Sequence, residues 1–244
     1  MRTRTTLAAT ALIKTLASTC IANPADEASP PRLHLDHIIL GVADLDRGTD
    51  QFEQLTGVRP AYGGKHPFGT HNALVSLGDR TYLELIAVQP GAKSPAGMPD
   101  FAKFEHSTPF GWAVSAADET SLRKRLEDAG FQITAPQPGS RTTPAGAVLR
   151  WQTFGLAPGF GGAPFFIIWA PEVEHPSTTS PIGCTLERME IPSSDAEAAA
   201  RFQRAFALPV TFGSKDAAMT VTLSCPKGTV VFSPSEPTIH DRIE

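Results

Sequence analysis

The sequence lacks an excess of basic residues. Its 244 residues include 21 lysines and arginines and 25 aspartates and glutamates, so the formal net charge is −4. Binding to duplex phosphates needs a concentrated basic surface, and this balance argues against a nucleic-acid-binding protein. It gives equally little support to a polybasic membrane anchor. No apolar run reaches the roughly 20 residues that a membrane-spanning helix requires.

The sequence also has few long stretches without glycine or proline, because it contains 20 glycines and 22 prolines. Both residues interrupt regular structure, so we expect many turns and short elements rather than a bundle of long helices. Hydrophobic residues make up 41% of the chain and charged residues 19%. That composition can bury a core and is unlike that of a disordered chain. The length suits one large domain or two small ones.

The first residues of the chain differ in character from the rest. Arg2 and Arg4 precede an apolar stretch that is followed by polar residues and prolines, an order typical of a secretory signal peptide. We predict a signal peptide over residues 1–22, a tether over residues 23–32, and a periplasmic or secreted protein with no membrane attachment after cleavage. The alternative, which Lys14 within the apolar stretch supports, is an N-terminal tail on a cytoplasmic protein.

Cysteine is rare, and removal of a signal peptide would leave two of the 3 cysteines, Cys184 and Cys225. Both stand at the ends of strand-like runs. An oxidising compartment allows such residues to form a disulfide if their strands are neighbours. The alternative is a pair of buried, inert thiols. Only the disulfide would give a mass shift when the mature protein is reduced.

Residues 33–90 form the first of two similar units. Residues 33–42 are apolar and β-branched with alternating faces, which predicts a strand. Asp44 or Asp46 can cap the helix that follows, and Gly57 can terminate it. Three more strands are expected, near residues 58–62, 72–77 and 81–88, with a turn at Gly63-Gly64 between the first two.

The same order of elements returns after a proline- and glycine-rich connector over residues 89–108. When the two helix segments are aligned, Gly57 falls on Gly130. Residues 109–171 are therefore predicted to be a second β-α-β-β-β module, with strands at 111–115, 131–134, 148–154 and 164–169. A shorter copy over residues 183–233 predicts a third, partial module packed on the same domain. The expected fold class is α+β, built from paired β-α-β-β-β modules.

Paired modules curve their sheets around a shared cavity, and two side chains of the first module are expected to point into it. His37 lies on the opposite face of its strand from Asp36 and Ile38, which we assign to the side that the helix covers. Glu84 stands in mid-strand among leucines, where a carboxylate is costly unless it is paired or ligated. These two residues are the main candidates for catalysis.

His37 and Glu84 can also be two ligands of a divalent metal, because imidazole and carboxylate together suit zinc, manganese, iron or nickel. Two ligands alone do not hold a metal. The alternative is a satisfied polar pair, in which Glu84 accepts a hydrogen bond from His37 or from a tyrosine hydroxyl. The residues by themselves leave both alternatives open.

Other side chains extend this candidate site. His66 lies in a glycine-rich loop that we expect at the cavity mouth, where a loop can present side chains to a ligand; a solvated histidine is the alternative. Trp112 and Trp169 fit the aromatic wall of a small-molecule pocket, unless they belong to the core. A surface role is expected for the histidines of connecting and terminal stretches, which are His106, His175 and His240.

These motifs together resemble the vicinal-oxygen-chelate superfamily, and more closely its glyoxalase-like branch. The motifs are LDHIIL at residues 35–40, the Gly-Gly-x-His stretch that continues through Thr70 and Asn72, YLELI at residues 82–86, and residues 164–169 with His175 behind them. The resemblance covers residues 33–232. It implies the fold of glyoxalases, bleomycin-resistance proteins and dihydroxybiphenyl dioxygenases, and it implies that His66, Thr70 and Asn72 contribute to a substrate site.

In that superfamily a divalent metal chelates substrate oxygens, with ligands from the first and last strands of both modules. By resemblance, His37 and Glu84 match the ligand positions of the first module. The second module departs from the pattern, with residues 110–112 (Phe-Gly-Trp) where a histidine would stand and Ile168 where a glutamate would stand. The ligand set is incomplete unless His66 or another loop residue completes it.

Two functions follow from these residues and the resemblance. The first is a glyoxalase-like enzyme of lyase or isomerase type that acts on an oxygen-rich small molecule, with Glu84 as a metal ligand or as a base. The second is a non-catalytic small-molecule binding protein of the same fold that has lost the metal. Ile168 favours the second, and the mid-strand carboxylate favours the first. Two complete modules make a monomer sufficient, and a homodimer is the alternative.

Overall fold

The computed structural model of the chain describes residues 33–240. The signal peptide and tether predicted for residues 1–32 lie outside this range. The described residues belong to one compact unit, Pro31–Glu244. Within it, no helix is long and apolar enough to cross a membrane.

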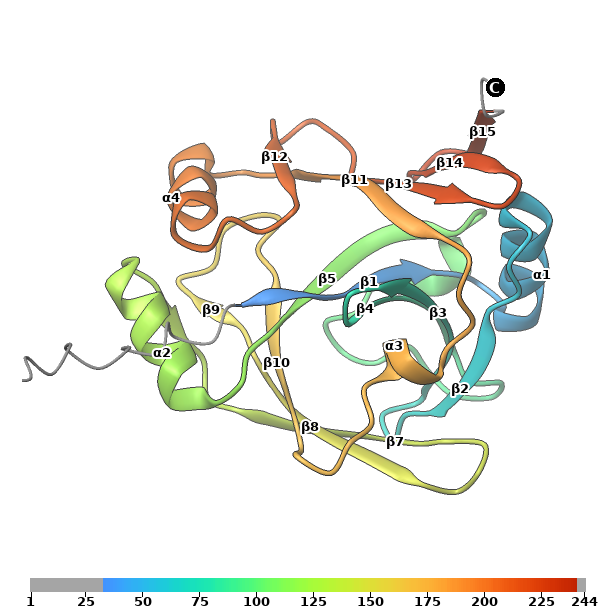
Figure 1. The fold of residues 1–244 in the computed structure, drawn as a ribbon, viewed down its shortest axis with the longest axis horizontal. Coiled ribbons are helices and arrows are strands. Elements are labelled where there is room, and N and C mark those ends of the chain that lie inside the picture. Colours follow the sequence, from blue (N-terminus) through green and yellow to red (C-terminus); the bar gives the residue numbers. More distant parts are fainter. Residues whose placement is uncertain (1–32, 241–244) are drawn as a thin grey trace, which may run out of the picture. The chain divides into compact units, whose positions relative to one another are not determined.

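Eight strands close into a barrel, which forms the centre of Figure 1. Neighbours around the barrel are β1 (His34–Gly41), β4 (Thr81–Val88), β3 (Thr70–Gly78), β2 (Ala61–Lys65), β7 (Gln137–Thr142), β8 (Val148–Phe154), β10 (Phe165–Trp169) and β5 (Thr108–Ser115). The first four strands belong to the first module and the last four to the second, so each module forms one half of the barrel. The predicted α+β fold of paired β-α-β-β-β modules is confirmed.

Both halves follow one pairing rule, in which the first strand lies parallel to the last. β1 pairs with β4, and β5 pairs with β10. A helix follows the first strand of each half, α1 (Leu45–Thr56) and α2 (Glu119–Asp128). The carboxylates of Asp44 and Asp118 accept hydrogen bonds from free backbone N–H groups at the two helix starts, which stabilises each start as expected of a capping residue.

The two modules meet at two seams of unequal length. β1 and β5 pair along most of their length in antiparallel register, with His37 opposite Ala113. β2 and β7 touch through a single pair, Lys65 with Thr142. The barrel is therefore firmly joined on one side and only just closed on the other.

The second strand of the second module is not where the sequence pattern placed it. Residues 131–134 contribute β6 (Gln132–Ile133), which pairs with β9 (Leu156–Ala157) in a separate two-stranded sheet. The barrel position belongs to β7, whose sequence begins Gln-Pro-Gly. Proline lacks the N–H that a central strand needs, but β2 pairs with β7 only at Thr142, so Pro138 lies where β7 has one strand neighbour. The predicted turn at Gly63-Gly64 is likewise part of strand β2.

A five-stranded sheet lies along the barrel and runs across the top of Figure 1. It contains β12 (Thr211–Gly213), β11 (Thr185–Pro192), β13 (Thr220–Cys225), β14 (Gly228–Phe232) and β15 (Thr238–His240), in that order, with α4 (Ala196–Phe206) between β11 and β12. The elements occur in the order of a module, but the strands pair differently. The first strand of this copy, β11, pairs with β12 and β13 and not with β14. Two short turns of helix, η1 (Phe101–Lys103) and α3 (Pro176–Thr179), complete the described chain.

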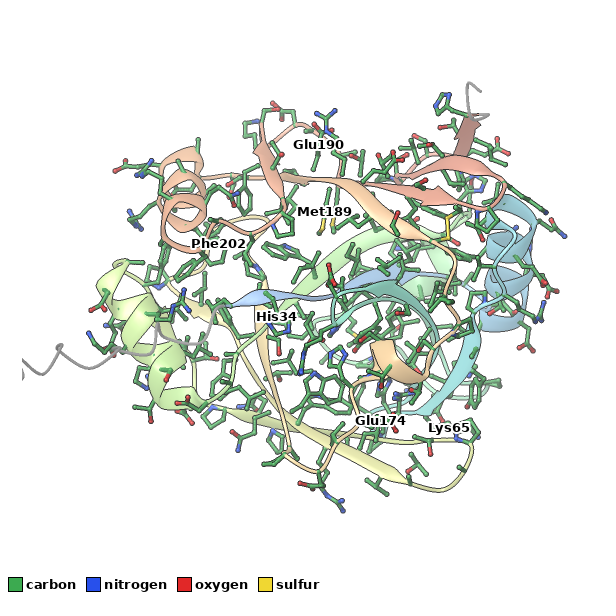
Figure 2. All side chains as sticks on the ribbon, in the orientation of Figure 1. His34, Lys65, Glu174, Met189, Glu190 and Phe202 are labelled. Carbon is green, nitrogen blue, oxygen red and sulfur yellow. A yellow bond between two sulfur atoms is a disulfide. The ribbon has the colours of Figure 1, made fainter. Side chains whose placement is uncertain are left out.

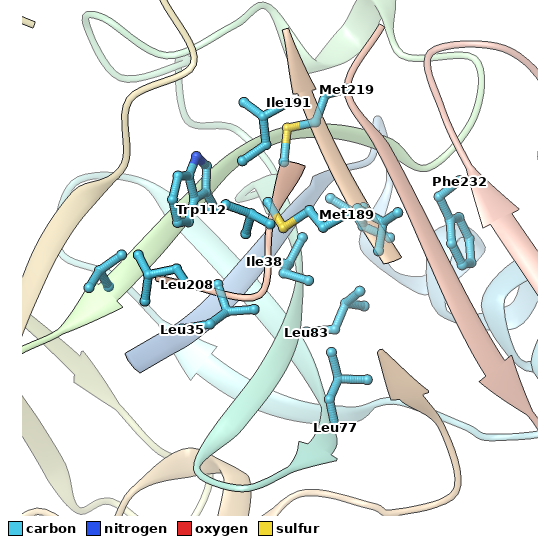
Figure 3. Packing of buried hydrophobic residues seen from close by; sticks show 14 of the residues in the cluster. Leu35, Ile38, Leu77, Leu83, Trp112, Met189, Ile191, Leu208, Met219 and Phe232 are labelled. Atoms are coloured by element: carbon cyan, nitrogen blue, oxygen red, sulfur yellow. The ribbon is translucent and has the colours of Figure 1, made fainter. Parts of the chain in front are cut away.

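The main core lies between the outer face of the barrel and this sheet. Figure 3 shows Met189 and Ile191 of β11 beside Ile38 and Trp112 of the barrel. Phe202, which points inward from α4 in Figure 2, is fully buried among aromatic rings of both parts. The thiols of Cys184 and Cys225 form a disulfide at one end of the sheet.

Candidate functional site

The barrel encloses a cavity of about 760 Å³ between the two modules. Strands of both halves line it, and residues of the connector after β4, among them Pro95 and Met98, form part of its wall. The connector was predicted only as a link, but its η1 packs a small apolar cluster against Ile39 and Ile86. A cavity of this size suits a small molecule.

The first strand brings two polar side chains together through a local irregularity. Strict alternation predicts that Asp36 lies on the opposite face from His37, and this prediction is wrong. The pairing of β1 with β5 shifts register between Leu35 and His37, and such a bulge re-aims side chains. The Asp36 Oδ1 atom lies 2.6 Å from His37 Nδ1.

Asp36 is completely buried and accepts three hydrogen bonds. The donors are His37 Nδ1 at 2.6 Å, Trp169 Nε1 at 3.0 Å and His175 Nε2 at 3.1 Å. Burial raises the pKa of the Asp36 carboxyl, but the hydrogen bonds from His175 and His37 outweigh it and hold that pKa well below its usual value. Because an ionised carboxylate only accepts, each imidazole nitrogen that faces it carries a proton.

The position of His175 contradicts the surface role that the sequence suggested for it. It is buried directly before α3, and its Nδ1 faces the hydroxyl and the backbone N–H of Ser177. Its Nε2 donates to Asp36, 139 positions away in sequence. No local pattern reports such a contact, although the motif resemblance already included His175.

Glu84 occupies the middle of the site on β4, and only 6% of its surface is exposed. Its Oε1 accepts a 2.7 Å hydrogen bond from Asn72 Nδ2 on the neighbouring strand β3. Two imidazole nitrogens lie slightly further away, His37 Nε2 at 3.8 Å from Oε2 and His66 Nε2 at 4.0 Å from Oε1. The structure thus brings together four of the residues that the sequence singled out.

His66 is held by Thr70 rather than exposed in a solvated loop. Thr70 Oγ1 lies 2.8 Å from His66 Nδ1, which leaves Nε2 facing Glu84. Thr70 itself is fully buried, so it positions His66 and presents no surface to a ligand. Burial lowers the pKa of the His66 imidazole, and His66 is therefore neutral at pH 7.

The two predicted tryptophans point to different sides of the barrel wall. Trp169 lines the cavity together with Trp151, whose ring centroid is 5.2 Å away. Trp112 borders the cavity, but its indole packs in the core against Phe202, and Nε1 donates to the carbonyl of Gly162. Trp112 pairs with Ile38 in register, so its ring faces the same way as that core residue (Figure 3).

Arg141 is a residue of the cavity that the sequence analysis missed. It lies on β7, the strand without a strand-like pattern, and its Nη1 is 3.4 Å from Asn72 Oδ1. Burial lowers the pKa of its guanidinium below the usual range. Tyr82 was also missed: its ring stacks on His37 with centroids 4.7 Å apart, and burial raises the pKa of its hydroxyl well above the usual value.

Comparison with known proteins agrees with this geometry. Residues 35–206, well over half of the chain, match the family of the glyoxalase-like domain. The chain belongs to the glyoxalase-like family of the vicinal-oxygen-chelate superfamily. None of the curated proteins matches the sequence.

Solved structures resemble this glyoxalase-like protein at low sequence identity. A hypothetical protein from Staphylococcus aureus is 18% identical, with 82% of this chain and 85% of that chain covered and a TM-score of 0.56. Methylmalonyl-CoA epimerase from Mycobacterium tuberculosis is 19% identical, with 57% and 89% covered and a TM-score of 0.39. The first likeness concerns the fold alone.

Glyoxalase-like folds imply a divalent metal, and the side chains of this cavity do not fit one. Among residues 33–240, no group of three or more His, Cys, Asp or Glu side chains is arranged to hold a metal ion. The Glu84 oxygen nearest to His66 already accepts the Asn72 amide, and the cation of Arg141 lies in the same cavity. A second positive charge there would be repelled.

The second module of this glyoxalase-like barrel supplies no metal ligand. When the helix-capping residues Asp44 and Asp118 are aligned in sequence, Gly111 corresponds to His37 and Ala113 to Ile39. Phe165 corresponds to Glu84, because Phe165 pairs with Ala113 as Glu84 pairs with Ile39. Phe165 turns its edge to the His37 ring, with centroids 5.5 Å apart. Ile168, which the sequence pattern suggested for the ligand position, packs on the outer side against the main core. These two positions of the second module therefore carry a glycine and a phenylalanine, neither of which binds a metal.

Proposed function

We propose that this protein is a small-molecule enzyme of lyase or isomerase type, in which Glu84 takes a proton from a carbon next to a carbonyl group. The observation that carries this proposal is the carboxylate of Glu84, buried at the centre of a cavity with an imidazole nitrogen on either side. A carboxylate in this setting is costly for stability. This cost is explained if the Glu84 carboxylate takes part in catalysis.

The residues around Glu84 divide the proton transfer between them. Glu84 accepts the proton as the C–H electron pair moves into the carbon–carbon bond and the carbonyl oxygen becomes an enolate oxygen. His37 donates from Nδ1 to Asp36, so its Nε2 carries a lone pair directed at the cavity. This lone pair can accept a hydrogen bond from the bound substrate. Return of this proton from Glu84 to a different atom of the enolate, such as its oxygen, would restore the carboxylate and complete an isomerisation.

The test is exchange of hydrogen for deuterium next to a carbonyl. Proton NMR in D2O would follow 2-oxo acids, 2-oxoaldehydes and simple ketones incubated with the purified protein. We expect exchange with at least one class and a loss of about 10²- to 10⁴-fold in Glu84→Gln. A glutamine can still accept the hydrogen bond from Asn72, so the variant should fold. Glu187→Gln, on an exposed residue of β11, is the matched control and should keep the full rate.

A second function, a non-catalytic binding protein, is favoured by Phe165 and Gly111 at the second module's ligand positions. Absence of exchange above background with every compound, or full activity in Glu84→Gln, would contradict the enzyme proposal and favour binding. Elemental mass spectrometry of the purified protein belongs beside this test. Stoichiometric metal that His37→Ala and Glu84→Ala both abolish would overturn our conclusion that the donor set does not fit a metal.

A further inference from the structure

Arg141 is a buried cation that forms no ion pair with a carboxylate in the described part of the chain. Only 5% of its surface is exposed. Within residues 33–240 no ion pair of this residue lies within 4.0 Å, and its one side-chain hydrogen bond is the long contact with Asn72. Burying a charge without a partner is expensive, so the guanidinium needs an explanation that the fold does not give.

The neighbouring strand leaves space for this guanidinium. A Cβ atom on Gly63 of β2 would lie 2.2 Å from Arg141 Nη1 and 2.4 Å from Asn72 Oδ1. Any side chain at this position would therefore force the guanidinium to shift from its present place. The glycine pair that the sequence suggested as a turn instead lets β2 approach Arg141 closely.

The negative groups near Arg141 are already engaged. Glu84 accepts the Asn72 amide and Asp36 accepts three donors. The nearby Tyr82 hydroxyl stays protonated, because burial raises its pKa. The fork of N–H donors on Arg141 is thus available to a ligand. A guanidinium matches a carboxylate in shape and can hold both of its oxygens at once.

We propose that Arg141 binds the carboxylate of the substrate, so that the protein selects oxo acids with an apolar side chain over neutral carbonyl compounds. This inference rests on the proposed function and names its substrate class. Phe165, Trp151 and Trp169 supply an apolar wall for the rest of the molecule. Bound in this way, an oxo acid would have its carbonyl and adjacent carbon inside the same cavity as Glu84.

Binding of two matched pairs of compounds tests the selection. The pairs are 2-oxo-4-phenylbutyrate with 4-phenylbutan-2-one, and 2-oxohexanoate with hexan-2-one; in each pair a methyl group replaces the carboxylate. Calorimetric titration of the whole protein should show tighter binding of the acids. Arg141→Gln should weaken binding of the acids about 10- to 100-fold and change ketone binding less than about twofold. Arg150→Gln, on an exposed arginine of the neighbouring strand β8, should leave both unchanged.

A second variant keeps the test decisive if Arg141→Gln does not fold. Gly63→Ala retains the charge but displaces the guanidinium, and it should weaken the acids selectively as well. Equal binding of acids and ketones by the native protein, or equal loss of both in the variants, would overturn the proposal. The binding titration does not depend on catalysis, so the two proposals can fail separately. If the protein binds the acids selectively but exchanges no hydrogen for deuterium, the proposed enzyme function is contradicted and the role of Arg141 stands.

Discussion

At the scale of single residues, Asp36 organises more of the site than any residue predicted to act in it. It fixes the proton of His37 on Nδ1, holds the indole of Trp169 at the cavity wall, and ties the chain before α3 to the barrel through His175. A carboxylate that accepts several hydrogen bonds keeps its negative charge. The direction in which His37 offers its free nitrogen therefore depends on Asp36.

Asp36→Asn should destabilise the protein by about 3 kcal/mol at pH 7, because buried donors lose a charged acceptor. The pKa of Asp36 is lower in the folded than in the unfolded protein. Its stabilisation is therefore present above the unfolded pKa of about 4 and is lost as the pH falls further. Urea unfolding between pH 7 and pH 3 should show the gap between native protein and variant narrowing below about pH 4.

The matched control for this substitution is Asp118→Asn. Asp118 caps α2 at the surface, and its pKa is also lowered, through hydrogen bonds from the first turn of the helix. An asparagine caps a helix about as well as an aspartate, so this variant should lose much less stability than Asp36→Asn. A pH-independent gap for Asp36→Asn would mean that Asp36 is not ionised in the folded protein.

At the scale of elements, the short seam between β2 and β7 decides whether the barrel closes. Gly64 in β2 has φ of +137°, and a Cβ atom on it would lie 1.9 Å from the backbone oxygen of Thr142 in β7. The neighbouring pair, Lys65 with Thr142, is the only pair that joins these strands. A side chain at position 64 would therefore force the two modules apart on this side.

Gly64→Ala should cost about 2–4 kcal/mol, through backbone strain and loss of the seam. Gly146→Ala is the control, because Gly146 also has a positive φ, +84°, but a Cβ atom on it meets open space. That change should cost about 1 kcal/mol. Urea unfolding of both variants measures the difference, and equal losses would show that the close approach of β2 to β7 contributes nothing.

At the scale of the whole molecule, the barrel and the five-stranded sheet are joined by one core. The ring of Phe202 of α4 contacts the rings of Trp112 of β5, Phe166 of β10 and Phe131, which directly precedes β6, with ring centroids 5.9 to 6.4 Å apart. Because neither part can keep these rings buried without the other, we expect both parts to unfold together.

Phe202→Ala should lower the free energy of unfolding by about 3–5 kcal/mol without splitting the transition. Ile182→Ala, at a side chain that is 81% exposed, should change it by less than about 0.5 kcal/mol. Urea unfolding followed by both circular dichroism and tryptophan fluorescence would test this. Two separate transitions in either variant or in the native protein would mean that the sheet is an independent unit.

The sequence by itself determined the repeated modules and half of the site. Alternating apolar residues and capping aspartates are local signals, so strands β1, β3 and β4 and helices α1 and α2 were predictable. Glu84 stood out because a carboxylate in an apolar strand violates a strong preference, and His37 stood out by its face. The glycine-rich loop drew attention to His66, and the resemblance of short motifs added Thr70 and Asn72.

Only the tertiary structure decided how these residues are supported and charged. A bulge in β1 turned Asp36 toward His37, against the alternation on which the sequence prediction depended. His175 lies 139 residues from its partner Asp36, and Arg141 lies 69 residues from its partner Asn72. Contacts between residues so far apart in sequence cannot be predicted from the local sequence. The hydrogen bonds that keep Asp36 ionised, and the burial that keeps His66 neutral and Tyr82 protonated, exist only once the chain has closed around these residues.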